Sequence, residues 1–217
     1  MGEHRGCYGK HHKISVIVAF YKGNQYMERL FKGIKTVAEK VKDRAELEVV
    51  LVNDSPDVEA ELPDSGDAVV IKNEKNLGIQ KTRANGIRRS TGDWILILDQ
   101  DDELVADGFG RQLELMDESD IVVGNGLYQY GNSMVRIYKS LKEMNYLLQK
   151  KRFLEIRNLI PSPGECLIRK TAIPEFWMNH PLQHNGADDW LLWILLFQEG
   201  CRFACNEENV YIHHDAG

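Results

Sequence analysis

Residues 94–103 read Trp94-Ile95-Leu96-Ile97-Leu98-Asp99-Gln100-Asp101-Asp102-Glu103, and this stretch decides the fold that the sequence predicts. Its five successive apolar residues indicate a strand buried on both faces, which is typical of the centre of a parallel α/β sheet. The strand runs directly into four acids within five residues. Because ligands bind at the carboxyl ends of strands in such sheets, we expect these carboxylates to lie at a ligand site.

The four acids have two interpretations. Like charges this close repel one another, and a hard divalent cation such as Mg²⁺ or Mn²⁺ would offset the repulsion through oxygen ligands. Alternatively, the acids form a solvated turn after the strand, because acids are common in loops. This stretch alone leaves both interpretations open, so the decision rests on the remainder of the chain.

Composition describes an ordinary soluble globular domain. The chain has 217 residues, of which 43% are hydrophobic and 28% charged, as expected for one domain with a full core. The net charge of −6 argues against nucleic acid as the main partner, because no domain-wide basic field exists. No apolar stretch approaches the ~20 residues that cross a bilayer. We expect a cytoplasmic protein and leave open an association with the inner face of the membrane.

The N-terminus and the cysteines carry no clear site. Residues 1–13 are polar and lack the apolar core of a signal peptide, so we predict a flexible leader with solvated histidines, followed by a single domain over 14–217. Cys201 and Cys205 lie four residues apart, but no second pair with ligand spacing accompanies them. We therefore expect reduced thiols in all four cysteines, including Cys7 and Cys166, rather than a zinc site.

Strands and helices alternate in the first half of the chain. The predicted strands cover 14–20, 47–52, 68–71 and 94–98, and the predicted helices cover 25–41 and 79–90. This alternation predicts an α/β fold with a mainly parallel central sheet, flanked by helices and connected by right-handed crossovers.

The second half is less regular. We predict helices over 109–117, 140–159 and 188–199, strands over 121–123, 166–168 and 210–215, and a hairpin over 127–137. The helix over 140–159 is rich in Lys and Arg and is expected on the surface, with contact to an anionic membrane or acceptor as the alternative. The helix over 188–199 is expected to be almost wholly buried. The acids at its start, Asp188 and Asp189, either complement the helix dipole or present a carboxylate in a site.

Motifs along the chain resemble those of the large family 2 of inverting, GT-A-fold glycosyltransferases. The resemblance extends from Ile14 to about His214, nearly the whole chain. Its motifs are Ser15 to Tyr21, Val52-Asn53-Asp54, Asn76-Leu77-Gly78 with Arg83 and Gly86, Asp99-Gln100-Asp101-Asp102, Gly186 to Trp193, and the late His214. Each motif is weak alone, whereas all of them in order at fitting separations make a strong joint signal.

The resemblance implies a GT-A fold with a Rossmann-like sheet and a transferase of the hexosyltransferase type, EC 2.4. Residues 14–103 would bind the nucleotide sugar, and residues 104–217 would bind the acceptor and supply the catalytic base. The donor nucleotide, favoured as UDP, would contact Ala19, Phe20, Tyr21, Asp54, Asn76, Gly78, Arg83, Asp99 and Gln100. Mn²⁺ or Mg²⁺ would contact Asp101, Asp102 and His214, with His213 as a substitute for His214.

Each implied role has a physical reason. Asp54 would accept a hydrogen bond from a ring N–H of the base, Asp99 would bind the ribose, and Arg83 would reach the base or the phosphates. A metal ion at Asp101 would neutralise the charge that builds on the leaving diphosphate. For Asp102, a role as a structural acid is as good an interpretation as a role in metal binding.

The resemblance makes Asp189 the catalytic base, with Asp188 beside it. We expect like-charge repulsion between these two acids to raise one pKa toward a useful value.

The expected partners are a nucleotide-sugar donor and a carbohydrate, lipid-linked or protein-linked glycan acceptor, as in bacterial polysaccharide, lipopolysaccharide or glycoprotein synthesis.

The chain departs from the family pattern at Asn53-Asp54-Ser55-Pro56-Asp57, at Ala84 and at Leu195, which weakens the donor assignment. The alternative is a non-catalytic nucleotide-sugar-binding or interaction module on the same fold. The presence of every motif acid argues against this alternative, because a decayed site should have lost some of them. A nucleotidyltransferase or a dinucleotide-binding enzyme would need a Gly-rich phosphate loop after the first strand, and none follows it.

Overall fold

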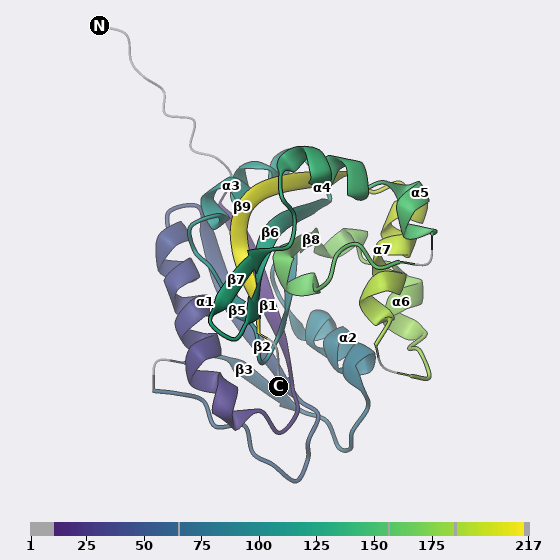
Figure 1. Ribbon diagram of the computed structural model, residues 1–217. Coiled ribbons are helices and arrows are strands. Elements are labelled where there is room, and N and C mark those ends of the chain that lie inside the picture. The colour runs from purple at the N-terminus through teal and green to yellow at the C-terminus, as the bar shows by residue number, and fades with distance from the viewer. Residues whose placement is uncertain (1–10, 65, 156, 185, 215–217) are drawn as a thin grey trace, which may run out of the picture.

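The computed structural model describes residues 11–64, 66–155, 157–184 and 186–214, which form a mixed α/β fold around one sheet (Figure 1). The strand order is β3-β2-β1-β4-β8-β6-β9-β5, and β7 pairs with β6. The strands are β1 (His12–Phe20), β2 (Ala45–Asn53), β3 (Val69–Lys72), β4 (Trp94–Asp99), β5 (Glu103–Leu104), β6 (Ile121–Tyr130), β7 (Ser133–Arg136), β8 (Cys166–Arg169) and β9 (Phe203–His214). The α-helices are α1 (Met27–Val41), α2 (Ile79–Arg89), α3 (Phe109–Glu114), α4 (Leu141–Leu147), α5 (Lys150–Phe153), α6 (Glu175–Asn179) and α7 (Asp188–Gln198). Short 3-10 turns lie at η1 (Asn24–Tyr26), η2 (Met116–Glu118), η3 (Pro163–Glu165) and η4 (Lys170–Ala172).

The first four strands form the parallel part of the sheet, as the sequence predicts. β1 pairs with β2 on one side and with β4 on the other, both in parallel. Ala19 lies opposite Asp99, and Phe20 lies opposite Asn53. The carboxyl ends of β1, β2 and β4 therefore meet at one edge, where an α/β sheet binds its ligands.

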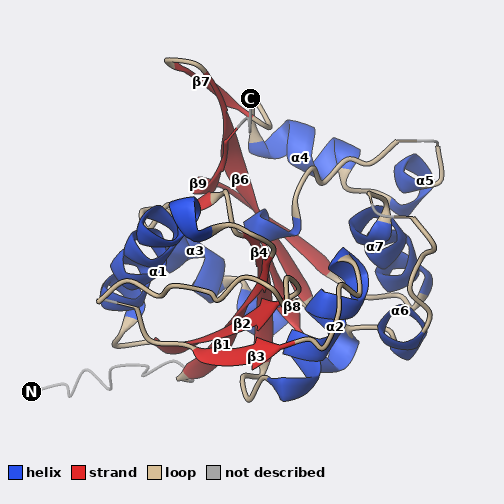
Figure 2. Cartoon of the chain, turned by 90° about the horizontal axis from the view of Figure 1, so that it is seen from below, coloured by secondary structure: helices blue, strands red, loops and turns tan. Residues whose placement is uncertain are grey.

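The central strand β4 is buried on both faces, which confirms the prediction from its apolar run. Each residue from Trp94 to Leu98 is at most 1% exposed. Trp94, Leu96 and Leu98 pack in the core that includes α1 and α3, whereas Ile95 and Ile97 pack in the core that includes α2 and α7. Figure 2 shows these two groups of helices on opposite sides of the sheet. Burial of each large apolar side chain stabilises the fold by about 1.5–3 kcal/mol.

The second half completes the sheet with mixed pairing. β8 is antiparallel to both of its neighbours, β4 and β6, while β6 and β9 are parallel. The predicted hairpin is present as β6 and β7. The last strand starts at Phe203 rather than at Val210, and the pairing of Glu103 with Ile212 brings its end beside the acids that follow β4.

The prediction of a single helix over 140–159 is wrong. The chain breaks at Leu148, and Gln149 is extended, so α4 and α5 are separate short helices. In a straight helix Phe153 would point about 140° away from Leu148. The break instead allows both side chains to be buried in the same core.

Two further boundaries differ from the prediction. β1 begins at His12, which is only 6% exposed, so the leader ends before it; residues 1–10 lie outside the described part. Helix α7 is not almost wholly buried. Asp188, Leu192, Trp193 and Leu196 form its buried face and its other apolar residues are half-buried, because a helix that covers a sheet contacts the core along one face only.

Within the described residues, no helix combines the length and the apolarity needed to cross a bilayer. Cys166, Cys201 and Cys205 are free thiols. Cys7 lies outside the described residues.

Gly86 packs α2 against the sheet, and we expect Gly86→Ala to destabilise the protein. A Cβ at this position would lie 2.5 Å from Ile17 Cγ2 and 3.1 Å from Val52 Cγ2, both on core side chains. Overpacking of this kind costs about 1–3 kcal/mol, which exceeds the gain of up to ~1 kcal/mol from the better helix propensity of Ala. Urea unfolding measures the difference.

The matched control is Gly110→Ala in α3, where a Cβ would meet no atom within 4 Å. This variant should be as stable as the parent or more stable. Equal stability of the Gly86 and Gly110 variants would contradict the packing of α2 described here.

Candidate active site

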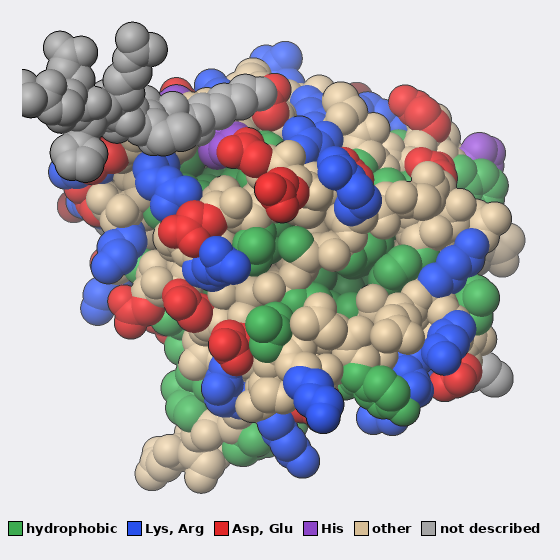
Figure 3. Space-filling view, turned by 90° about the horizontal axis from the view of Figure 1, so that it is seen from above, with side chains coloured by type: hydrophobic (Ala, Val, Ile, Leu, Met, Phe, Trp, Pro, Cys, Tyr) green, Lys and Arg blue, Asp and Glu red, His purple; other side chains and the backbone are tan. Residues whose placement is uncertain are grey.

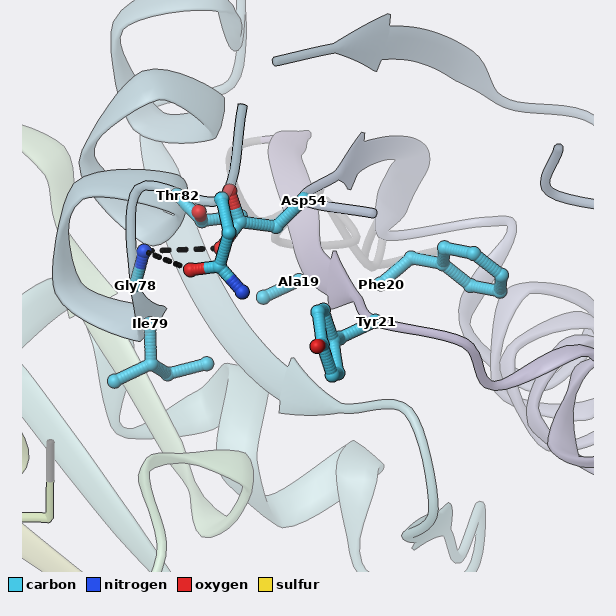
Figure 4. A pocket seen from close by; sticks show the side chains of 8 residues that line it. Ala19, Phe20, Tyr21, Asp54, Gly78, Ile79 and Thr82 are labelled. Carbon is cyan, nitrogen blue, oxygen red and sulfur yellow. Dashed lines mark hydrogen bonds between the residues drawn. The ribbon is translucent and has the colours of Figure 1, made fainter. Parts of the chain in front are cut away.

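A cavity of about 380 Å³ opens at the carboxyl ends of β1 and β2 and at the start of α2. It is lined by Ala19, Phe20, Tyr21, Asp54, Asn76, Gly78, Ile79 and Thr82. Six of these residues were predicted to contact the donor nucleotide. Figure 4 shows Asp54 and Gly78 on one side of the cavity and the Tyr21 ring near its other side, with the Phe20 ring turned away. The Phe20 side chain is buried in the core, so Phe20 contributes its backbone.

Asp54 is fixed in the cavity by three hydrogen bonds. Its Oδ1 accepts from Leu77 N and Asn73 Nδ2, both at 2.8 Å, and its Oδ2 accepts from Gly78 N at 3.0 Å. Gly78 has φ +83°, a conformation that favours glycine and turns its N–H toward the carboxylate. A carboxylate can accept about four hydrogen bonds, so Asp54 keeps capacity for one more donor.

Gln100 joins the acidic loop to the cavity. Its side-chain Oε1 accepts from Tyr21 N at 2.9 Å, and its Nε2 donates to Tyr21 O at 3.0 Å. This pair of bonds holds the end of β1 against the end of β4. Gln100 therefore shapes the cavity wall through the backbone of Tyr21, although its side chain does not line the cavity.

Arg83 forms an ionic bridge between two distant acids. Nη2 donates to Asp99 Oδ1 at 2.5 Å, and Nη1 donates to Asp188 Oδ2 at 2.8 Å. Arg83 and Asp188 are buried, and Asp99 is half-buried. Burial alone lowers the pKa of Arg83, but the charges of Asp99 and Asp188 outweigh it and raise the pKa, so the guanidinium stays charged. Both terminal nitrogens of Arg83 are thus engaged by protein, which differs from the predicted reach to the base or phosphates.

The two acids at the start of α7 have different surroundings. Asp188 is buried and paired with Arg83. Asp189 is half-buried; its Oδ1 accepts from Trp190 N at 2.7 Å and its Oδ2 accepts from Asn158 Nδ2 at 3.0 Å. Burial raises the pKa of Asp189, and the charge of Asp188 raises it further. The raised pKa confirms the expected direction, with burial rather than repulsion as the larger cause.

Asp101 is the acid of the loop without a cationic side-chain partner among the described residues. Its backbone carbonyl accepts from Arg29, which holds the loop in place. Burial raises the pKa of Asp101, and the negative charges of Asp102 and Asp99 raise it as well. The loop thus concentrates negative charge around Asp101, which His213 offsets only in part, because the pKa of Asp101 stays raised.

Asp102 is occupied by contacts with the last strand, and its predicted contact with a metal stays a prediction. It is 1% exposed. Its Oδ2 accepts from the Tyr211 hydroxyl, and its Oδ1 accepts from His214 N at 3.1 Å and lies 3.2 Å from His213 Nδ1. The structure therefore supports the interpretation of Asp102 as a structural acid that ties β9 to the loop.

The two late histidines point in different directions. The ring of His213 contacts Asp102, whereas His214 Nε2 lies 3.3 Å from Glu103 Oε2. The hydrogen bond with Asp102 raises the pKa of His213, although partial burial opposes this shift. Both histidines thus contact acids of the loop, His213 at Asp102 and His214 at Glu103, and the predicted contact of His214 or His213 with a metal stays a prediction.

Across the described residues, no three His, Cys, Asp or Glu side chains converge to hold a metal ion without other ligands. Among the described acids of the loop, Asp101 is the one whose carboxylate forms no ion pair. Mg²⁺ in nucleotide sites is commonly bound by one or two carboxylates and completed by substrate phosphates. The donor set at the loop fits a cation that arrives with a diphosphate.

Sequence reasoning missed three residues that hold the site together. Asn73 supports Asp54, Asn158 supports Asp189, and Tyr211 supports Asp102. They lie 19, 31 and 109 residues from their partners. Asn and Tyr in loops and strands are common, and no spacing rule connects residues this far apart, so the sequence carries no signal for these contacts.

The sequence profile described as "Glycosyl transferase family 2" matches residues 15–177. The chain belongs to this family. It is 28% identical over 120 residues to the "Putative glycosyltransferase EpsH" of Bacillus subtilis, which covers 52% of this chain and 33% of that protein. It is 29% identical over 108 residues to an "Uncharacterized glycosyltransferase" of Haemophilus influenzae, with 49% and 35% covered. The matched region spans about a third of each of these relatives.

Solved structures show the same fold. Residues 1–349 of S. aureus TarS in complex with UDP-GlcNAc match with a TM-score of 0.71 and 19% identity, covering 94% of this chain and 59% of that one. The complex of the same region with UDP matches with a TM-score of 0.68, covering 93% and 60%. The predicted GT-A fold of the glycosyltransferases is confirmed.

Proposed function

We propose that this chain is a metal-dependent, inverting glycosyltransferase that moves a sugar from a UDP-sugar to an acceptor hydroxyl. The observation that carries the proposal is the arrangement of three groups: the cavity around Asp54, the carboxylate of Asp101 in the loop after β4, and the half-buried Asp189, whose neighbour Asp188 is joined to Asp99 by Arg83. A nucleoside, a diphosphate and an acceptor would each meet one of these groups. The proposed role is synthesis of a bacterial polysaccharide, lipopolysaccharide or other glycan, by transfer of a hexose-type sugar.

The cavity supports a uracil-type base. Asp54 has one free acceptor position, and a ring N–H of uracil is a suitable donor for it. The Tyr21 ring beside the cavity offers an apolar face for the base. The TarS structures with UDP and UDP-GlcNAc, on the same fold, favour the same class of donor.

A divalent cation at Asp101 would offset the charge that develops on the leaving diphosphate. Arg83 occupies both Asp99 and Asp188 with its terminal nitrogens, so Asp101 is the acid of the loop that we expect to meet the cation. We assign Mn²⁺ or Mg²⁺ on this donor set, because both prefer oxygen ligands. His213 lies close enough to the loop to contact a phosphate or the ion.

Asp189 takes the proton of the acceptor hydroxyl in this proposal. It is partly accessible, and its two hydrogen bonds to Asn158 and Trp190 fix its orientation. The hydroxyl oxygen then attacks the anomeric carbon as the bond to the diphosphate breaks, which inverts the configuration in one step. Asp188 is a positioning residue, because Arg83 already engages it and it is buried.

Release of UDP from UDP-sugars in the presence of Mn²⁺, measured from pH 4 to 8, tests the proposal. Only ionised Asp189 can accept the proton, and its pKa lies above the usual value for Asp. We therefore expect the rate to fall as the pH drops through this raised pKa, with a slope of one proton. UDP binding measured over the same range separates loss of the base from loss of donor binding.

Failure of all UDP-sugars and other nucleotide sugars to turn over would remove the catalytic assignment. A protein that binds nucleotide sugars without turnover would match the non-catalytic module on the same fold.

A further inference from the structure

One segment of the chain has a net positive charge, whereas the chain as a whole has a net negative charge. Residues 139–157 hold six of the 27 Lys and Arg residues but two of the 33 Asp and Glu residues, a formal charge of +4 within a chain of −6. None of the six cations forms an ion pair with any other described residue. Lys142, Lys150 and Lys151 are exposed, so their charge is available to an external partner.

The same segment exposes large apolar side chains. Tyr146 and Leu154 are 56% and 59% exposed. The guanidinium of Arg152 lies 3.6 Å from the centre of the Tyr146 ring and thereby joins α4 to α5. We define the α4–α5 surface by Lys142, Tyr146, Lys150, Lys151 and Leu154.

The opposite sides of α4 and α5 explain why these residues face outward. Met144, Leu148 and Phe153 are buried in the core that includes α7. The break between α4 and α5 turns Phe153 into that core and leaves Lys150, Lys151 and Leu154 at the surface. Figure 3, which views this end of the molecule, shows Lys and Arg side chains interspersed with hydrophobic and acidic ones.

We propose that the α4–α5 surface binds the anionic face of a lipid bilayer. Lysines beside acidic headgroups contribute favourable electrostatic energy. Leucine and tyrosine side chains enter the boundary between headgroups and acyl chains. A basic surface that serves solubility alone has no need for two large exposed apolar side chains, and an acidic bilayer satisfies both features at once.

The α4–α5 surface lies next to the candidate catalytic base. Trp190 Nε1 donates to Phe153 O at 3.1 Å, and Asn158, five residues beyond Phe153, donates to Asp189. The segment that contacts the bilayer therefore also holds the start of α7. Given the proposed function, an acceptor carried by a lipid would approach Asp189 from the membrane side.

Sedimentation of the full chain with lipid vesicles tests the proposal. The vesicles are phosphatidylcholine alone, or phosphatidylcholine with about one third phosphatidylglycerol. We expect binding to the anionic vesicles that weakens as salt is raised. The double variant Lys150→Glu/Lys151→Glu should lower the partition coefficient at least about tenfold, and Leu154→Ser should lower it several-fold.

The matched control is Lys32→Glu/Lys35→Glu on α1, which makes the same change in net charge at exposed positions of another surface. This control should bind anionic vesicles as the parent does. Absence of binding to the anionic vesicles, or equal losses in the two double variants, would overturn the proposal. UDP binding with Mn²⁺, measured on each variant, should equal that of the parent. If the parent itself does not bind UDP, that result counts against the proposed function and not against the bilayer surface.

Discussion

Asp189→Asn is expected to lower the rate of sugar transfer by about 10²–10⁴-fold, because the amide cannot accept the proton of the acceptor hydroxyl. The affinity for UDP should change little, since Asp189 is not among the residues that line the nucleotide cavity. Asparagine preserves the size of the side chain and can still accept from Trp190 N. A steady-state assay of UDP release, together with UDP titration, separates the two effects.

Glu199→Gln provides the control for this variant. It makes the same change of charge at the exposed other end of α7, and we expect the transfer rate to remain that of the parent. If Asp189→Asn keeps more than about a tenth of the parental rate, another group serves as the base.

Arg83→Met should produce the largest loss of stability among the site variants. Removing the guanidinium leaves Asp188 buried without a cation and leaves Asp99 without its partner. Loss of one partner from a buried ionic pair typically costs about 3–5 kcal/mol. Arg83→Lys should recover only part of this loss, because one ammonium group cannot bridge two carboxylates as the planar fork of arginine does.

Urea unfolding of Arg83→Met, Arg83→Lys and Arg89→Met measures this effect. Arg89 lies on the same helix at an exposed position and forms no ion pair with a described residue, so its replacement should change the stability by less than about 0.5 kcal/mol. Equal stabilities of the Arg83→Met and Arg89→Met variants would show that the bridge between Asp99 and Asp188 does not hold the site together.

The sheet was predictable from the sequence because local patterns specify it. The apolar run before Asp99 can be satisfied only by burial on both faces, and the structure places it at the centre of the parallel strands. Residues that line the cavity around Asp54 could also be named from the sequence. The motifs that contain Gly78 and the end of β1 occur in the same order along the chain as in the family that the sequence resembles.

Side-chain pairing within the site was not predictable in the same way. The motif order does not show that Arg83 engages Asp188, 105 residues away, or that Tyr211 engages Asp102. The predicted long helix failed for a similar reason. Its helical spacing is continuous, and only the need to bury both Leu148 and Phe153 in one core explains the break.

Calorimetric titration of UDP with and without Mn²⁺, on the parent and on Asp101→Ala, tests the central claim most directly. We predict that Mn²⁺ tightens UDP binding by at least about tenfold in the parent, since a divalent cation held by Asp101 would offset the charge of the diphosphate, and that the variant loses this dependence. Asp57→Ala, an exposed acid after β2, should behave as the parent does. UDP binding that is the same with and without Mn²⁺, or a metal effect that persists in Asp101→Ala, would contradict the claim.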